Sequence, residues 1–206
     1  MPVAFYPLNA RYKAADKESR QPEGIPRNVA STNGPYNEPG GAYMFYGTVN
    51  GYIKFPNIRG PYGGFAITLM CWVQPGGQDG PLFSYQYSGP ELRIKDGRFF
   101  FSLRYGSSVY LTTPEVLPTG KWGHVAVSYD HNTRVSLLYI NGLLKAGRRI
   151  DRGFRSIISD RTVRMGSDIN GRDHFKGKIA EMKVYDVALK GAQVQTSIKQ
   201  GSFTFP

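Results

Sequence analysis

The chain is short of cysteine and of long hydrophobic runs, and each shortage excludes a class of protein. Cys71 is the one cysteine among 206 residues, so no disulfide can form within the monomer and cysteine chemistry gives secretion no support. No window approaches the ~18 consecutive apolar residues of a membrane-spanning helix, so we expect no membrane insertion. The first residues are too short and too polar-flanked for a secretion signal. The chain is therefore either cytosolic or the mature domain of a secreted protein.

The motifs of common enzymes are also missing. We find no His-Glu-x-x-His metal site, no Gly-x-Ser-x-Gly nucleophile turn and no phosphate-binding loop. The three histidines stand apart, with His124 in a predicted strand, His131 in a turn and His174 ahead of a strand. Glu181 is a solitary carboxylate with Lys183 on its own face. We therefore predict no catalytic residues.

The charge balance is strongly basic and points to a polyanionic partner. The chain has 26 Lys and Arg against 15 Asp and Glu, a net charge of +11, which favours sulfated glycans, nucleic acid or anionic membrane surfaces. One basic stretch is broken only by Asp151 and Asp160, and it contains Lys145, Arg148, Arg149, Arg152, Arg155, Arg161 and Arg164. Two interpretations stay open, a solvated loop that serves solubility or an anion-binding patch. Since guanidinium pairs bidentately with sulfate and carboxylate, the candidate ligand-binding residues are Arg148, Arg149, Arg152 and Arg155.

Glycine and proline, 25 and 14 residues, are scattered and separate many short β-branched or aromatic segments, as is typical of strands. The predicted strands are Val3–Leu8, Ala42–Tyr46, Tyr52–Pro56, Phe65–Gln74, Pro81–Gln86, Leu92–Lys95, Arg98–Tyr105, Val109–Thr112, His124–Tyr129, Val135–Ile140, Thr162–Met165 and Lys178–Tyr185. Only Leu189–Lys199 indicates a helix, and residues 9–41 are expected to form a loop-rich segment that wraps the sandwich edge. We predict one all-β domain over residues 1–206, a sandwich of two antiparallel sheets. The length favours a jelly roll over the smaller immunoglobulin sandwich.

The segment Ala66–Val73 shows the strand alternation clearly. Its residues are expected to divide between two faces, with Ile67, Leu69, Cys71 and Val73 on one and Thr68, Met70 and Trp72 on the other. Cys71 is then a buried small hydrophobe rather than a nucleophile.

Two alternating segments that meet at a polar turn, Trp122–Asp130 and Val135–Leu144, form the most informative motif. Other motifs accompany this hairpin along nearly the whole chain, namely Phe5–Asn9, Gly41–Gly47, Gly51–Pro56, Phe65–Val73, Pro81–Tyr85, Val163–Gly166 and Phe175–Leu189. In this order the chain resembles laminin-G-like and pentraxin-like domains of the concanavalin A-like lectin/glucanase superfamily. The resemblance implies a concanavalin A-like jelly roll in an extracellular protein.

The resemblance also bears on the cysteine. Pentraxins pair a cysteine in the strand that matches Leu69–Val73 with one in the strand that begins here at His124. The matching partner position is Ala126, so the resemblance implies that Cys71 has no disulfide partner.

A calcium site is a further implication of the resemblance. The loop after Gly166 offers side-chain oxygens from Asp168, Asn170 and Asp173, and calcium takes about six to eight oxygen ligands. The second acidic element of pentraxins is replaced by Ser88–Glu91, so their paired site is not expected. A single Ca²⁺ held partly by backbone carbonyls and a simple polar turn stay the alternatives.

Fourteen tyrosines are many for this length. Most lie in strands and are expected to pack, whereas others lie in glycine-rich loops or at strand ends, including Tyr36, Tyr62, Tyr85, Tyr87, Tyr105 and Tyr110. A tyrosine ring can stack on a sugar while its hydroxyl binds a polar group. Tyr85, Tyr87 and Tyr105 join the arginines as predicted glycan-binding residues.

Three functions follow from these observations. We expect a non-catalytic recognition module that binds carbohydrate, with anionic or sulfated glycans preferred. The alternative is an adhesion or protein-interaction domain of a larger extracellular protein, including self-association. A sandwich-fold glycan hydrolase or lyase is a remote alternative, because no Glu-x-Asp-x-x-Glu run is present. Nucleic acid is not expected as a partner, since no aromatic-plus-basic single-strand platform is recognisable.

Overall fold

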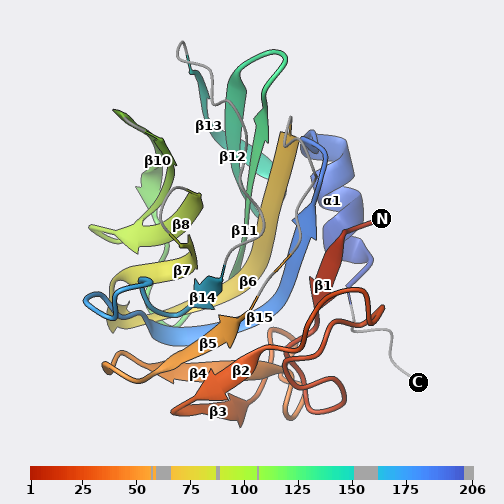
Figure 1. Ribbon diagram of the computed structural model, residues 1–206, viewed down its shortest axis with the longest axis vertical. Coiled ribbons are helices and arrows are strands. Elements are labelled where there is room, and N and C mark those ends of the chain that lie inside the picture. Colours follow the sequence, from red (N-terminus) through yellow and green to blue (C-terminus); the bar gives the residue numbers. More distant parts are fainter. Residues whose placement is uncertain (57, 59–65, 87–88, 106, 151–161, 202–206) are drawn as a thin grey trace.

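The computed structural model describes residues 1–56, 58, 66–86, 89–105, 107–150 and 162–201, and for residues 104, 105 and 107–109 it describes the backbone alone. Fifteen strands and one helix are present in this part of the chain. Two antiparallel sheets contain the strands (Figure 1). Among the described residues, no helix is long and apolar enough to cross a membrane.

Sheet A has eight strands, which are β1 (Ala4–Tyr6), β3 (Val29–Thr32), β4 (Ala42–Tyr46), β6 (Ala66–Gln78), β11 (Gly123–Asp130), β12 (Val135–Ile140), β13 (Leu143–Arg149) and β15 (Lys176–Tyr185). Their order is β13-β12-β11-β6-β15-β4-β3, and β1 pairs with β15. Sheet B has seven strands, which are β2 (Ile25–Arg27), β5 (Tyr52–Phe55), β7 (Gly80–Tyr85), β8 (Pro90–Lys95), β9 (Arg98–Tyr105), β10 (Ser107–Val116) and β14 (Val163–Met165). Their order is β10-β9-β8-β7-β14-β5-β2. The predicted sandwich of two antiparallel sheets is confirmed.

The main core lies between the two sheets and depends on alternation along the strands. Ile67, Leu69, Cys71 and Val73 of β6 all belong to it, as predicted. The opposite face of β6 carries Met70, which packs in a second cluster beneath the helix. Cys71 is fully buried, and burial raises the pKa of its thiol, so it is an inert core residue.

The residues beside Cys71 on β11 bear on its predicted lack of a disulfide partner. The residue directly opposite Cys71 on β11 is Val125, whereas Ala126 lies opposite Met70 and belongs to the second cluster. Neither of these two residues is a cysteine, so Cys71 has no disulfide partner on β11.

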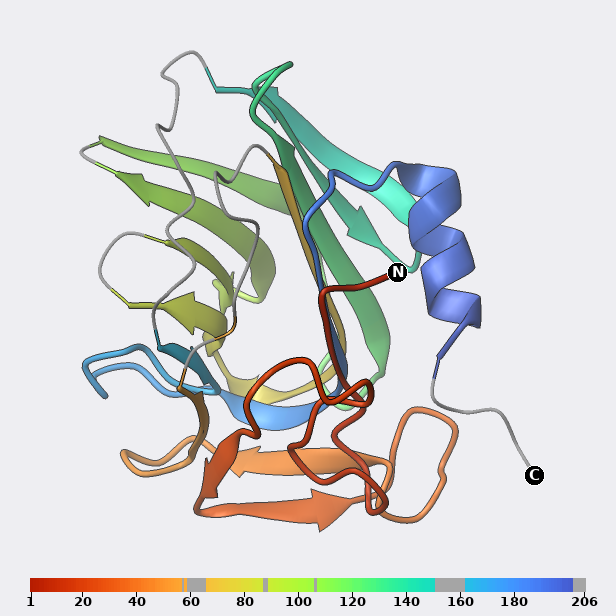
Figure 2. The ribbon, with the colours of Figure 1, turned by 45° about the vertical axis from the view of Figure 1, so that its right-hand side comes forward.

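Helix α1 (Gly191–Lys199) covers part of the outer face of sheet A, close to the predicted range (Figure 2). Val194 and Leu189 pack against Met70, Ala126 and Tyr185 in the second cluster. The buried Lys183 ammonium donates to the carbonyl oxygens of Ser197 at 2.8 Å and Gln200 at 3.4 Å. Carbonyl groups at a helix C-terminus have no partner within the helix, so Lys183 anchors this end of α1 to the sheet.

Three strands were not predicted, and two of them lie in the N-terminal segment that was expected to form loops. Within the expected loop 9–41, β2 adds to the edge of sheet B and β3 adds to the edge of sheet A. Only Asn28 separates them, with a φ of 43°. Asparagine tolerates this left-handed conformation, so the chain passes from one sheet to the other within a single residue.

The third missed strand is β13, which contains Arg148 and Arg149. Five of its seven residues are exposed and the rest are half-buried, so its sequence shows no period of two.

The turn between β12 and β13 explains part of the sequence motif. Asn141 and Gly142 both have positive φ, 51° and 76°, as a tight two-residue turn requires, and the Asn141 side chain accepts a hydrogen bond of 2.8 Å from the backbone N–H of His124.

His124 provides a test of this packing. Its side chain is buried, and burial, together with the nearby Lys183 ammonium, lowers its pKa from 6.5 to about 3. The folded protein therefore holds a neutral ring where the unfolded chain takes up a proton, so stability present above pH 6.5 is lost as the pH falls towards 3. The maximum slope is about 1.4 kcal/mol per pH unit.

We expect the His124→Phe variant, which keeps an aromatic ring against Trp72, to lose less unfolding free energy than the unmodified chain between pH 7 and pH 4.5. Urea titrations at both pH values measure the difference. Identical pH dependence in the two proteins would contradict a buried neutral imidazole.

Candidate ligand-binding surface

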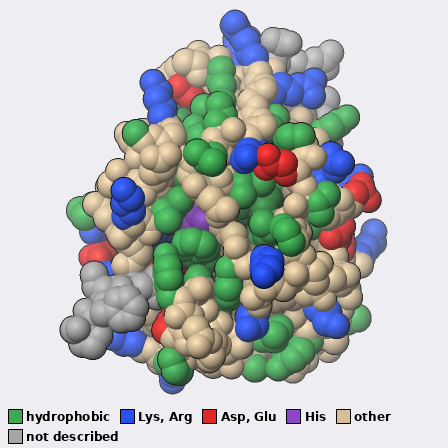
Figure 3. Space-filling model, turned by 180° about the vertical axis from the view of Figure 1, so that it is seen from behind, with side chains coloured by type: hydrophobic (Ala, Val, Ile, Leu, Met, Phe, Trp, Pro, Cys, Tyr) green, Lys and Arg blue, Asp and Glu red, His purple; other side chains and the backbone are tan. Residues whose placement is uncertain are grey.

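Strand β13 does not present its two arginines as one patch. Arg148 lies opposite the buried Ser136 of β12 and Arg149 lies opposite Val135, and consecutive strand residues point to opposite faces. Arg148 thus points towards sheet B, where it contacts Tyr110, while Arg149 points away from sheet B. Arg152 and Arg155 lie outside the described residues. On the face seen in Figure 3, Lys and Arg side chains are also spread over the surface and do not form one patch.

The predicted tyrosines fare differently from one another. Tyr85 is 5% exposed and packs in the main core, so it cannot stack on a ligand and its selection was wrong. Tyr85 is the last residue of β7, and a position at the end of a strand does not by itself indicate whether the ring faces the core or the solvent. Tyr87 lies outside the described residues, and for Tyr105 only the backbone is described. Among the described side chains of this region, an exposed ring belongs to Tyr110 of β10, which is 52% exposed.

Tyr110 stands at the centre of a group of aromatic and cationic side chains. Its ring stacks on Phe100 of β9, with centroids 5.3 Å apart and planes 17° apart. The Arg148 guanidinium lies 6.0 Å from the Tyr110 centroid, and the Lys95 ammonium lies 5.6 Å from the Phe100 centroid. These distances fall within the range of cation–π attraction. We call Lys95, Phe100, Tyr110 and Arg148 the Tyr110 cluster.

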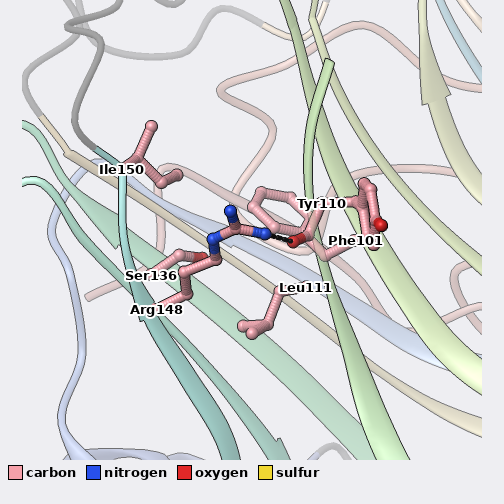
Figure 4. Close-up of a pocket in the computed structure, with 6 residues that line it drawn as sticks. All are labelled: Phe101, Tyr110, Leu111, Ser136, Arg148 and Ile150. Carbon is pink, nitrogen blue, oxygen red and sulfur yellow. Dashed lines mark hydrogen bonds between the residues drawn. The ribbon is translucent and has the colours of Figure 1, made fainter.

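Arg148 also joins the edges of the two sheets. One of its terminal N–H groups donates to the Tyr110 carbonyl oxygen at 3.4 Å (Figure 4). Nearby, Lys145 of β13 pairs with Glu115 of β10 at 2.8 Å. The small pocket around Arg148, lined also by Phe101, Leu111 and Ile150, is too tightly filled to admit a ligand. A ligand at this place would therefore contact the exposed surface of the Tyr110 cluster.

A second group of polar side chains lies on β8, in the middle of sheet B. The Glu91 carboxylate is 2% exposed. It accepts a hydrogen bond from the Ser84 hydroxyl at 3.2 Å and one from Arg93 at 3.3 Å. The other end of the Arg93 guanidinium pairs with Asp173. One guanidinium is thus shared between two carboxylates, and no sequence pattern indicates this network because Arg93 and Asp173 are 80 residues apart.

The loop expected to bind calcium is held by internal hydrogen bonds. One Asp168 carboxylate oxygen accepts the backbone N–H groups of Arg172 at 2.6 Å and Asp173 at 3.3 Å. Asp173 pairs with Arg93, and Asn170 is exposed. Within the described ranges, no three His, Cys, Asp or Glu side chains are grouped to hold a metal ion. As arranged, these side chains do not form a calcium cage, and calcium binding stays a prediction.

A larger cavity of about 490 Å³ lies between the N-terminus and helix α1. Tyr185, Leu189 and Ser197 contribute to its wall, and among the described residues no Lys, Arg, Asp or Glu side chain lines it. It therefore has fewer cationic side chains to offer an anionic ligand than the Tyr110 cluster.

Comparison with known proteins places the chain in a family. The family described as the "Concanavalin A-like lectin/glucanases superfamily" matches residues 47–195. The chain belongs to this superfamily. The predicted resemblance to laminin-G-like domains is confirmed, and so is the predicted fold. No curated protein matches the chain.

Several solved structures share the concanavalin A-like fold with this chain. Domain 4 of an extracellular arabinanase from Geobacillus stearothermophilus, solved with arabinotriose, is 20% identical with a TM-score of 0.77, covering 95% of this chain and 97% of that one. The binding domain of botulinum neurotoxin serotype G is 16% identical with a TM-score of 0.77, covering 99% of this chain and 52% of that one. A Limulus polyphemus pentraxin is 22% identical with a TM-score of 0.59, covering 74% and 79%. Identities this low show the fold alone.

The ion network around Glu91 yields a stability prediction. The Arg93→Met variant removes the ion pairs that Arg93 makes with the buried Glu91 carboxylate and with Asp173, and removing one partner of a buried pair costs about 3 kcal/mol. We expect a loss of this order in the free energy of unfolding, measured by urea titration. Arg172→Met removes the same charge from an exposed residue of the neighbouring loop and should change stability by less than about 0.5 kcal/mol. Equal effects of the two substitutions would show that the network does not stabilise the fold.

Proposed function

We propose that this concanavalin A-like domain is a non-catalytic recognition module that binds acidic or sulfated glycans at the Tyr110 cluster. One observation carries the proposal: the exposed Tyr110 ring stacks on the half-buried Phe100 ring, and a cation lies beside each ring. Arg148 belongs to the arginine-rich stretch that was predicted to bind the ligand. Tyr110 takes the role of stacking on a sugar ring that was predicted for the buried Tyr85.

The chemistry of the cluster suits a charged sugar. An exposed tyrosine ring offers an apolar face for a sugar ring and a hydroxyl for its polar groups. Arg148 uses one N–H group on the Tyr110 carbonyl, and a guanidinium has five such donors, so others remain for a sulfate or carboxylate. Lys95 supplies a second cation at the Phe100 end.

The comparisons support a binding role and an extracellular location. The arabinanase domain was solved with arabinotriose, and its parent enzyme is extracellular. The neurotoxin structure is a binding domain. These proteins make carbohydrate or receptor binding a reasonable role for this superfamily member, and the cationic surface supports an acidic ligand over a neutral one.

A comparison of two neighbouring arginines tests the site. We expect Tyr110→Ala and Arg148→Gln to weaken binding to heparin fragments by about tenfold each, or ~1.4 kcal/mol, in isothermal titration calorimetry. Arg149→Gln removes an equal charge from the opposite face of β13 and should have little effect. Binding should also weaken as salt rises.

Two results would contradict the proposal. Equal losses in Arg148→Gln and Arg149→Gln would indicate unspecific attraction to the net charge. A glycan array with no acidic or neutral ligand would favour the protein-interaction alternative instead.

The calcium prediction has its own test. If Ca²⁺ binds beside Asp168, millimolar calcium raises the melting temperature of the chain, because a ligand of the folded state stabilises it, and the rise is lost in Asp168→Ala. The quantity compared is the calcium-induced shift within each protein, so a lower melting temperature of the variant does not confuse the result. An unchanged melting temperature in the unmodified chain would refute calcium binding.

A further inference from the structure

The outer face of sheet B carries a row of side chains that crosses the strands at right angles. Each member lies directly opposite the next on a neighbouring strand. From β10 to β5 the row reads Tyr110, Ser102, Glu91, Ser84, Arg164 and Lys54. The Tyr110 cluster thus lies at one end of the row, and two cations lie at the other end, on the strands drawn below β7 in Figure 1.

The cations at that far end surround a second tyrosine. The Arg164 guanidinium carbon lies 4.4 Å from the ring centroid of Tyr52. Arg164 of β14 is directly opposite Lys54 of β5, and Arg27 of β2 is directly opposite Tyr52. We call Arg27, Tyr52, Lys54 and Arg164 the Tyr52 cluster.

The Tyr52 cluster contains three cations, and two of them, Lys54 and Arg164, lie directly opposite each other. Like charges directly opposite each other on neighbouring strands are destabilising. Within the part of the chain that the structure describes, no carboxylate pairs with Arg27, Lys54 or Arg164. One terminal N–H group of Arg164 donates to the Asp168 carbonyl oxygen at 3.3 Å, and its buried Nε atom has no hydrogen-bond partner among the described residues. An anion bound between the three cations would relieve the repulsion between them.

We infer that the Tyr52 cluster is a second anion-binding subsite, and that one extended acidic oligosaccharide bridges it to the Tyr110 cluster across the strands of sheet B. This inference rests on the proposed function, since the Tyr110 cluster is one of its two ends. Its ligand is a chain of several sugars that carries sulfate or carboxylate groups near both ends.

The middle of the row explains why the acidic groups belong at its ends. Ser84, Glu91 and Ser102 are each less than 5% exposed, so they offer little surface to a ligand. Arg93, with a side chain 19% exposed, is shared between two carboxylates. A sulfate over this region would meet the exposed carboxylate of Asp173, and so the middle repels the charge that both ends attract.

Strand spacing sets the length of the ligand. The row runs from β10 to β5 over five strand intervals, and each interval is about 4.8 Å, so Tyr110 and Lys54 are about 24 Å apart. A disaccharide reaches one cluster at a time. A longer fragment engages both, and the second contact then benefits from a high effective concentration.

Size-defined heparin fragments, from disaccharide to decasaccharide, test the inference by calorimetry. We expect the affinity of the unmodified chain to rise by about tenfold or more once a fragment spans both clusters. A Lys54→Gln/Arg164→Gln variant should lose this rise and keep its affinity for the disaccharide. The control is Arg149→Gln/Lys178→Gln, which removes two charges from sheet A and should keep the rise.

The outcomes separate the two proposals. If the disaccharide binds in a Tyr110-dependent way but longer fragments gain nothing, or gain equally in the Lys54→Gln/Arg164→Gln variant, the bridging ligand is refuted and the proposed function stands. If the control loses the rise as well, the gain comes from net charge and the second subsite is refuted. If no fragment binds the unmodified chain, the proposed function fails. Should Arg164→Gln disturb folding, judged by its melting curve, Arg27→Gln/Lys54→Gln on the exposed side of the cluster makes the same test.

Discussion

The burial of β6 on both faces is the constraint on which the rest of the structure depends. This 13-residue strand lies between β11 and β15 in sheet A. One face fills the core between the sheets, and the other contributes to the cluster beneath α1. The outer face needs a cover, because apolar groups such as Met70 would otherwise meet water. Helix α1 provides it, and the buried Lys183 ammonium secures the helix end.

Polar side chains hold several elements of this sandwich together. Lys183 binds a helix end, Arg93 connects β8 to the loop that contains Asp173, and Asn141 closes the β12–β13 turn onto His124. Each of these pairs restricts the geometry around it. The cations on the outer face of sheet B differ, since Arg27, Lys54 and Arg164 have no carboxylate partner among the described residues. These cations are the main physical support for an anionic ligand.

Much of the fold could be predicted because its strands are rich in β-branched and aromatic residues and are separated by glycine, proline and polar turns. Successive residues of β6 between Ile67 and Val73 point to opposite faces of the sheet, and this division follows directly from the two-residue period of a strand. Strand β13 could not be found in this way, because both of its faces are largely exposed and no apolar period appears. The site was harder still, since it depends on which face a residue takes. Arg148 and Arg149 are neighbours in sequence and point apart, and Tyr85 turns inward where Tyr110 turns outward.

The single-residue crossing at Asn28 has a consequence for the solubility of the molecule. Because β2 and β3 lie at the ends of the two sheets, one short piece of chain occupies both sheet edges on this side of the sandwich. Without it, β5 and β4 would become edge strands with open rows of N–H and C=O groups, and such rows recruit strands from other molecules. The N-terminal segment therefore moves the open edges of the two sheets from β4 and β5 to β3 and β2, and at the sheet B edge Pro26 supplies no backbone N–H to a strand from another molecule.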